Sequence, residues 1–181
     1  MPYEPPPELA GLSLAEVADL VAARKLPPVA DWSPENLGDS EMRIAADGKW
    51  FHQGGEISRP AMVRAFASLL TCDGTGQHWL VTPVQKLSIE VEDAALIATD
   101  VSQQSDALIF RLNTDELVIA GPEHPITAEG DPDTPAIYLA VRNGTRARLN
   151  RSTYAQLVEI ALADDTLAVT SQGARFPLRP A

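Results

Sequence analysis

The sequence predicts an α+β protein in which an N-terminal helix precedes two related units, each an antiparallel sheet with one helix. Three observations support this class. Turn signals recur at short intervals between strand-like runs, apolar residues fall at helical spacing in three stretches, and two segments repeat the order hairpin, arginine, helix, acidic turn and strand. We therefore divide the 181 residues into an arm and helix (1–30), a first unit (31–83) and a second unit (84–181).

The first helix follows a proline-rich arm, which we expect over residues 1–12. Ser13 and Glu16 have the spacing of a capping box, in which the serine oxygen accepts a hydrogen bond from a free backbone N–H group at the helix start. Leu14 and Val17 begin an apolar stripe at helical spacing. Pro27-Pro28 ends this helix, because proline cannot continue it.

Two further helices of about three turns are expected. Ser58 can cap the first, over about 59–70, with Pro60 in the first turn, where a missing N–H group costs nothing. Ser152 can cap the second, which runs to about residue 162. Elsewhere no cap precedes an apolar stripe, so these three should be the only substantial helices.

Glycine turns separate the expected strands. Gly54-Gly55 and Asn143-Gly144 each suit a tight hairpin, because glycine adopts positive φ without steric cost. In the two repeated segments Arg59 and Arg151 each stand at a helix start, two residues after an apolar residue, and we expect them at equivalent positions. A long loop is expected over 121–135, and strands over 42–45, 49–53, 56–57, 78–81, 87–91, 96–101, 107–112, 117–120, 137–142, 145–150, 166–170 and 174–178.

The chain is acidic, with 25 Asp and Glu against 14 Lys and Arg and a net charge of −11. This balance excludes a uniformly basic surface for a nucleic-acid polymer and disfavours attraction to anionic membrane lipid, so we expect neither partner. The single cysteine cannot form a disulfide within the chain and suits a reducing compartment. The N-terminal residues lack the pattern of a signal peptide, and no apolar run is long enough to span a bilayer. We therefore expect a soluble cytoplasmic protein.

A series of short motifs runs through the chain in a specific order and spacing. They are Trp32-Ser33-Pro34, Asp47-Gly48-Lys49-Trp50, His52, Ile57-Ser58-Arg59, Leu80-Val81-Thr82-Pro83, Lys86, Ile89-Glu90-Val91-Glu92-Asp93, Tyr138, Val141-Arg142-Asn143-Gly144 and Ala147-Arg148-Leu149-Asn150-Arg151. In these motifs the sequence resembles the bacterial domain of unknown function 1285, and the resemblance covers nearly the whole chain beyond residue 30.

This resemblance implies two related units, the second similar to a pleckstrin-homology-type barrel. It also implies a ligand site between the units for a nucleotide-like molecule, and a role in signal transduction. The family has no established activity. The sequence departs from the family pattern at Gln85, where glutamate is usual after Thr-Pro-Val, and at Ala95-Leu96, where Pro-Phe is usual. The first departure removes a charged group that could contact a ligand.

The segment from Arg142 to Arg151 contains four arginines and no acid within a strongly acidic chain. An arginine side chain can bind a carboxylate or phosphate through two parallel hydrogen bonds. The segment is therefore the first candidate for an anion site, with Arg142 and Arg148 as the main contacts. The alternative is that these arginines form surface ion pairs with acidic neighbours, each of which stabilises the fold little.

Other residues are weaker candidates. In the segment from Thr82 to Lys86, proline leaves backbone donors free and the lysine adds charge, although a plain connection between strands explains it equally well. His52 lies between two glycine turns, where it can contact a ligand or serve the structure. Glu90, Glu92 and Asp93 could hold a hard cation, but no further ligands follow at loop spacing, so no metal is expected. Cys72 is expected to be a poor nucleophile, because the charge of Asp73 disfavours a thiolate.

We expect a non-catalytic ligand-binding or regulatory protein that takes a small anionic, nucleotide-like molecule between its units, without a cofactor. The expected ligand contacts are His52, Arg59, Thr82, Lys86, Arg142, Arg148 and Arg151. Two alternatives stay open. One is a protein-interaction module that uses the barrel-like half and no small ligand, and the other is an enzyme of unrecognised type that uses His52 with Glu92 and Asp93.

Overall fold

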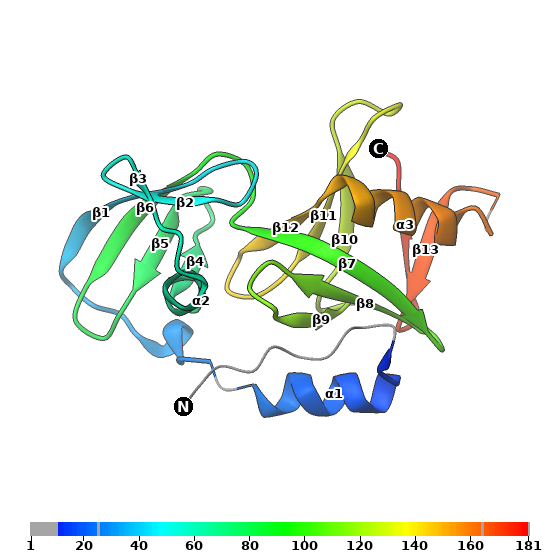
Figure 1. The fold of residues 1–181 in the computed structure, drawn as a ribbon, viewed down its shortest axis with the longest axis horizontal. Coiled ribbons are helices and arrows are strands. Elements are labelled where there is room, and N and C mark those ends of the chain that lie inside the picture. The colour runs from blue at the N-terminus through cyan, green and yellow to red at the C-terminus, as the bar shows by residue number, and fades with distance from the viewer. Residues whose placement is uncertain (1–10, 25, 164, 181) are drawn as a thin grey trace. The chain divides into compact units, whose positions relative to one another are not determined.

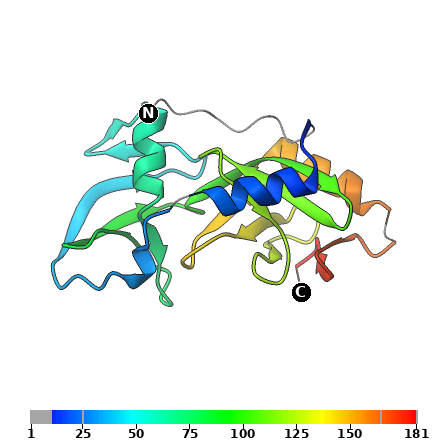
Figure 2. The same ribbon diagram turned by 90° about the horizontal axis from the view of Figure 1, so that it is seen from below.

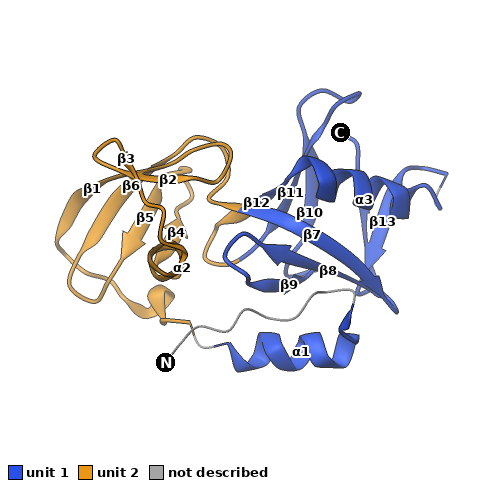
Figure 3. Ribbon diagram, in the orientation of Figure 1, with its two compact units in different colours: residues 1–24, 97–141, 147–181 blue, residues 25–96, 142–146 orange. Residues whose placement is uncertain are grey.

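The computed structural model describes residues 11–24, 26–163 and 165–180, so most of the expected N-terminal arm lies outside the described residues. The chain forms two compact units, which Figure 3 colours separately. Unit 2 comprises residues 25–96 and 142–146, and unit 1 comprises residues 1–24, 97–141 and 147–181. Each unit is therefore assembled from segments that are not continuous in the sequence.

Unit 2 is built around a six-stranded sheet with the strand order β3-β2-β1-β6-β5-β4 (Figure 1). Its strands are β1 (Leu37–Ile44), β2 (Trp50–His52), β3 (Gly55–Glu56), β4 (Leu70–Cys72), β5 (His78–Val81) and β6 (Lys86–Val91). Strands β1 and β6 pair in parallel, and the other neighbouring pairs are antiparallel. The sheet thus joins two three-stranded meanders along β1 and β6.

Unit 1 contains a six-stranded sheet with the order β10-β11-β12-β7-β8-β9. Its strands are β7 (Leu96–Gln104), β8 (Ala107–Leu112), β9 (Leu117–Ile119), β10 (Ile126–Glu129), β11 (Ala136–Ala140) and β12 (Arg146–Leu149). From the opposite edge the order is β9-β8-β7-β12-β11-β10, which repeats the order of unit 2 six strands later. A separate two-stranded sheet follows, formed by β13 (Ala168–Ser171) and β14 (Ala174–Pro177). The predicted α+β class with two related units is confirmed.

Among the described residues there are three α-helices, as predicted: α1 (Leu14–Ala23), α2 (Pro60–Ala67) and α3 (Arg151–Ala161), besides a 3₁₀ turn at Val29–Asp31. Ser13 caps α1 as expected, and its Oγ accepts from the Glu16 N–H group at 3.2 Å. The other two predicted caps are wrong. Arg59 is the N-cap of α2 and forms no side-chain cap, and Asn150 caps α3 by accepting from the Thr153 N–H group at 2.9 Å. None of the described helices has both the length and the apolar character that a bilayer crossing needs.

Two strands occupy positions predicted as helix or loop. Leu70 begins β4 instead of ending the preceding helix, because it pairs with Leu80 and is almost fully buried in the sheet. The segment 121–135, expected as one loop, contains β10, which pairs with β11. In both cases antiparallel pairing with the next strand overrides the local pattern.

The duplication has a different register from the one that the sequence predicts. The repeated element is the run of six strands, β1–β6 and β7–β12. Helix α2 lies within its copy, between β3 and β4, whereas α3 follows the last strand of the other copy. Arg59 and Arg151 both stand at helix starts, but at different points of the repeat, so the prediction that they are equivalent is wrong. The hairpin–helix order is locally alike in the two places, which explains the error.

The boundary between the units falls after β6 rather than at residues 83 and 84. Strand β6 pairs with both β1 and β5 and so completes the sheet of unit 2. Residues 142–146, at the turn between β11 and β12, also belong to unit 2. There the carbonyl of Asn143 accepts a hydrogen bond from the N–H group of Cys72 at 2.9 Å.

The two sheets bury their faces differently. In unit 2, Trp50 of β2 is buried and stacks on Phe66 of α2, with ring centroids 6.3 Å apart and planes at 18°. In unit 1, Ile109 of β8 shares a core cluster with Val17 of α1, which Figure 2 shows alongside the strands of this unit. Phe110, which points to the opposite face of β8, is also fully buried. Unit 2 therefore has one helix-covered face, and unit 1 buries both.

Candidate ligand site on the sheet of unit 2

The face of the unit 2 sheet opposite Trp50 and α2 gathers residues from three strands. Side chains of directly paired residues lie on the same face, and Lys86 of β6 pairs with Leu37 of β1 and Val81 of β5. Ser88, two residues along β6, pairs with Asp39 and Trp79 in the same way. We call this surface the Lys86 face, defined by Leu37, Asp39, Trp79, Val81, Lys86 and Ser88.

The segment preceding β1 turns one end of this face into a hollow of about 360 Å³. The 3₁₀ turn buries Val29 to 3% exposure, and Trp32 and Pro34 follow it as one wall. The sheet supplies the opposite wall, formed by Leu37, Thr71, Val81 and Lys86. Small-molecule sites usually measure about 300–1,000 Å³, so this Lys86 hollow has room for a small ligand.

Lys86 is half-buried, and its Nζ lies 4.6 Å from the centre of the Trp79 ring, a cation–π contact. The Trp79 indole N–H group donates to Asp73 at 3.0 Å. This bond and a shorter one from the Thr75 hydroxyl, which has the larger effect, hold the pKa of the Asp73 carboxyl well below its usual range. Among the described residues no carboxylate forms an ion pair with Lys86. Lys86, which lines the hollow, therefore keeps a positive charge that no described carboxylate pairs with.

Thr82 begins the turn that leads into Lys86, the first residue of β6, and its hydroxyl group is bonded within that turn. Its Oγ1 accepts from the N–H groups of Gln85 at 3.1 Å and Val84 at 3.3 Å. Such bonds between a threonine and the following backbone stabilise a turn. The structure brings Thr82 and Lys86 together, with the hydroxyl engaged in the turn and the lysine lining the hollow.

The arginine segment makes structural contacts. Arg142 donates from Nη2 to the carbonyl of Ala67 at 3.2 Å, at the C-terminal end of α2, where positive charge is favourable. Arg148 is half-buried and has a partner, and Arg151 is exposed at the first residue of α3. Arg142 belongs to unit 2, whereas Arg148 and Arg151 belong to unit 1. That one ligand contacts these arginines together with Lys86 stays a prediction.

His52 and Arg59 are both exposed and do not line the Lys86 hollow. His52 ends β2 and pairs with Gly55 in the β2–β3 hairpin. The carboxylate that the enzyme alternative assigned to it, Glu92, accepts from Arg43 at 2.6 Å with one oxygen and from the Ala46 N–H group at 2.9 Å with the other. Both oxygens of Glu92 therefore have structural partners.

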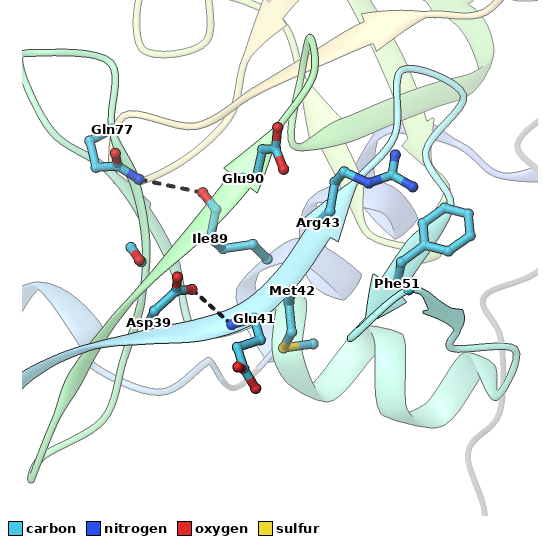
Figure 4. Close-up of a pocket in the computed structure, with 10 residues that line it drawn as sticks. Asp39, Glu41, Met42, Arg43, Phe51, Gln77, Ile89 and Glu90 are labelled. Atoms are coloured by element: carbon cyan, nitrogen blue, oxygen red, sulfur yellow. Dashed lines mark hydrogen bonds between the residues drawn. The ribbon is translucent and has the colours of Figure 1, made fainter.

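A second hollow of about 450 Å³ lies further along β1 and β6 (Figure 4). Its cation, Arg43, lies 4.4 Å from the centre of the Phe51 ring and is paired with Glu92. Three carboxylates line it: Asp39, Glu41 and Glu90. Negative charge prevails there, so an anion is disfavoured. The two hollows of this sheet thus have opposite electrostatic character.

Cys72 lies in β4, not at a helix end as expected. Burial raises the pKa of its thiol, Asp73 raises it further, and Arg146 opposes them. A thiolate is therefore disfavoured, which makes the thiol a poor nucleophile. No group of three or more His, Cys, Asp or Glu side chains that could hold a metal ion is found among the described residues.

Of the residues that line the Lys86 hollow, only Lys86 was among the predicted contacts; Trp32 and Leu37 were not, nor was Trp79, which contacts Lys86 without lining the hollow. Trp32 had a signal, because it begins one of the family-like motifs. Trp79 had none, although its strand pairs with β6 across a short connection. Leu37 had none either, since its position beside Lys86 depends on the parallel pairing of β6 with β1. Local sequence does not contain that pairing.

Comparisons with known proteins agree on one family. The DUF1285 N-terminal domain, a domain of unknown function, matches residues 27–94, and the DUF1285 C-terminal domain matches residues 94–178. The crystal structure of a DUF1285 family protein from Silicibacter pomeroyi DSS-3 is 38% identical, with a TM-score of 0.78 over 93% of this chain and 96% of that chain. A DUF1285 family protein from Shewanella baltica OS155 is 26% identical, with a TM-score of 0.54 over 65% of this chain and 90% of that chain. No curated protein matches the chain. Since the two family models together span residues 27–178, the chain belongs to the DUF1285 family.

Proposed function

We propose that the chain is a non-catalytic ligand-binding or regulatory protein of the cytoplasm, with a role in signal transduction, and that unit 2 takes a small anionic molecule in the Lys86 hollow. The observation that carries this proposal is the charge of Lys86. It lines a hollow of about 360 Å³ and, among the described residues, forms no ion pair with a carboxylate. In a chain of net charge −11, such a local positive charge favours an anion at this point.

The surroundings strengthen the interaction. Lys86 is half-buried, and charges interact more strongly where less water screens them. Its contact with the Trp79 ring restricts where the ammonium group lies, so less side-chain freedom is lost when a ligand binds. The second hollow, with its three carboxylates, provides no comparable place for an anion.

Three groups that an enzyme could use, on Thr82, Glu92 and Cys72, are already bonded or unreactive, and this favours binding over catalysis. The Thr82 hydroxyl is bonded within its own turn, and both oxygens of Glu92 have partners. The raised pKa of Cys72 disfavours its thiolate. A group that must first break structural bonds is a poor general base or nucleophile.

A panel of nucleotides, inorganic phosphate and small carboxylates, screened by thermal shift and followed by calorimetry, tests the proposal. For any anion that binds, Lys86→Gln should raise Kd about 10- to 150-fold, the equivalent of about 1.5–3 kcal/mol for a charged hydrogen bond. Lys49→Gln is the matched control, because Lys49 lies on a different turn and lines neither hollow. The proposal fails if no anion binds, or if both variants weaken binding equally.

One observation favours a second function, a protein-interaction module. Leu37 and Val84 are 69% and 68% exposed; Leu37 pairs with Lys86 across the strands, and Val84 lies two residues before it in the sequence. The Asn36 side chain donates to the Val84 carbonyl at 3.1 Å, which holds the two segments together. Exposed apolar residues beside a charge are common in protein interfaces. A purified partner whose binding is abolished by Leu37→Ser but not by Lys86→Gln would favour this function over the anion site.

A further inference from the structure

The Lys86 hollow supplies a single unit of charge. Among the described residues that line it, Lys86 is the only charged one. The polar side-chain groups of the other lining residues, the hydroxyls of Ser33 and Thr71 and the indole N–H group of Trp32, are neutral. One ammonium group balances one negative charge, and each further charge on a ligand would have to leave water without a compensating cation.

Acidic residues around the hollow increase that penalty. Asp31 and Glu35 lie on the segment that forms its outer wall, and both are exposed. Asp39 lies two residues beyond Leu37 on the Lys86 face. Their negative charges repel a phosphate chain that extends out of the hollow. A nucleotide with a terminal phosphate or a phosphate chain, which carries about two or more negative charges, is therefore a poorer match than a monoanion.

The apolar walls of the hollow favour a ligand with an apolar part besides its charged group. Trp32 and Pro34 form one wall, and Leu37 and Val81 contribute to the other. Leu37 is 69% exposed without a ligand, so an apolar group beside it would remove hydrocarbon from water. The indole of Trp32 is flat, so another flat ring packs well against it, and the Pro34 ring adds apolar surface.

We propose that the ligand of the Lys86 hollow is an aromatic monocarboxylate. Its carboxylate would accept hydrogen bonds from Lys86 Nζ, and its ring would lie between the wall formed by Trp32 and the side chain of Leu37. This inference rests on the proposed function, because it specifies the chemical class of the anion bound at that same hollow. It replaces the nucleotide-like ligand that the family resemblance implies.

Four probes distinguish the contribution of the ligand's charge from that of its aromatic ring: 1-naphthoate, its neutral amide 1-naphthamide, acetate and ADP. Binding is measured on the full chain by calorimetry and by ligand-observed NMR. We expect 1-naphthoate to bind at least about tenfold more tightly than 1-naphthamide, because only the carboxylate pairs with the ammonium group. Acetate, which lacks the ring, and ADP, which carries excess charge, should bind more weakly than 1-naphthoate.

Variants assign the two parts of the ligand to the two parts of the hollow. Lys86→Gln should lower the affinity for 1-naphthoate to that for 1-naphthamide and leave the amide unaffected. Trp32→Ala should weaken both by the same factor. Lys49→Gln and Phe51→Ala, which lie outside the hollow, should change neither. A circular dichroism spectrum like that of the parent chain shows that each variant is folded.

The outcomes distinguish this inference from the proposed function. If ADP or inorganic phosphate binds through Lys86 and 1-naphthoate does not, the aromatic monocarboxylate is wrong while the anion site stands. If 1-naphthoate and its amide bind equally, or if Trp32→Ala has no effect, the inference is also wrong. If no anion binds, both the inference and the proposed function fail.

Discussion

The two six-stranded sheets share one strand order but are covered by different elements. In unit 2, α2 is inserted between β3 and β4 and packs on one face, so that along β6 Ile89 is 2% exposed while its neighbour Glu90 is exposed. In unit 1, the corresponding connection from β9 to β10 is a short turn closed by a bridge between Gly121 and His124. Elements outside the repeat contact this sheet instead, with α1 against β9 and β13 against β8.

This difference shows what decides where a repeated sheet can bind a ligand. Strand β8 is buried on both faces, and the hydroxyl of Ser171 in β13 even joins its backbone, accepting from the Leu108 N–H group at 2.8 Å and donating to the Ala120 carbonyl at 2.7 Å. The sheet of unit 2 keeps one face without a helix of its own, and both of its hollows lie there. The Lys86 face is accessible because no helix of unit 2 covers it, and not because of the strand order, which both sheets share.

The largest expected effects compare neighbouring residues on one strand. Trp50→Ala should lower the free energy of unfolding by about 3–5 kcal/mol, because it empties the contact with α2. Phe51→Ala, on the other face, should cost only about 1 kcal/mol, mainly its contact with Arg43. In β8, Ile109→Ala and Phe110→Ala should each cost about 2–5 kcal/mol, since both faces are buried.

Urea unfolding can assign these losses to a unit, because Trp32, Trp50 and Trp79 all lie in unit 2. Tryptophan fluorescence then follows unit 2, and far-ultraviolet circular dichroism follows the whole chain. A Phe51→Ala variant as destabilised as Trp50→Ala would show that both faces of the unit 2 sheet contribute equally to stability. The two sheets would then not differ in how their faces are buried.

The second prediction compares two hairpin glycines. Gly144 and Gly54 both have positive φ, at 77° and 84°, but a Cβ at 144 would collide with the carbonyl oxygen of Cys72, whereas a Cβ at 54 would meet open space. Gly54→Ala should cost about 1–2 kcal/mol from the backbone conformation alone. Gly144→Ala should cost about 1–3 kcal/mol more, because a backbone atom must move. Equal losses in chemical denaturation would mean that the turn at 142–146 is not held against β4.

The third prediction compares the starts of α2 and α3. Asn150→Ala should lower the free energy of unfolding by about 1 kcal/mol, since it removes the acceptor for the Thr153 N–H group. Ser58→Ala should have almost no effect, because the N-cap of α2 is Arg59 and has no side-chain bond. Thermal unfolding by circular dichroism measures both. A loss at Ser58 equal to that at Asn150 would restore the serine cap that the sequence predicts.

The smallest expected effect is the pH dependence of unit 2. Burial, with a further contribution from Arg146, lowers the pKa of His78 below the usual value, although Asp73 and a backbone hydrogen bond oppose this. The unfolded chain then binds more protons between the folded pKa and about 6.5, so stability present above about pH 6.5 is lost as the pH falls through this window. Asp73 does not contribute there, because its lowered pKa places its titration at more acidic pH.

Urea midpoints from tryptophan fluorescence at about pH 7.5 and about pH 5.5 test this effect. The parent chain should lose stability at the lower pH, and His78→Gln should lose less, because glutamine does not titrate. If the variant and the parent chain lose stability equally, the protonation of His78 is not the cause.

Local chemistry was sufficient to predict the helices, many of the hairpins and the family. The Ser13 cap, the glycine turns and the alternating strand around Ile89 each depend on residues within a few positions of one another. Caps and helix limits were less accurate, as Asn150 and Leu70 show. Leu70 pairs with Leu80 in the sheet, and the Asn150 N–H group donates to the Ala98 carbonyl at 3.0 Å, so contacts outside the helices accompany both differences.

The candidate site was predicted only in part. Lys86 was singled out as the charge of its turn, and it does line a hollow. Arg142 was singled out for its charge as well, but it bonds the carbonyl of Ala67 at the end of α2. An arginine that bonds the end of a helix and an arginine that can bind a ligand have the same sequence pattern. What separates them is the neighbour that folding places beside each.

By itself, the sequence determined the α+β class, the three helices and the existence of a repeat, because these follow from patterns within short windows. Only the tertiary structure decided the register of that repeat and the parallel pairing of β1 with β6. It also decided that the segment from Val29 to Pro34 forms a wall of the Lys86 hollow. These contacts join residues about fifty positions apart, and their free energy comes from burial shared by many side chains rather than from any local motif.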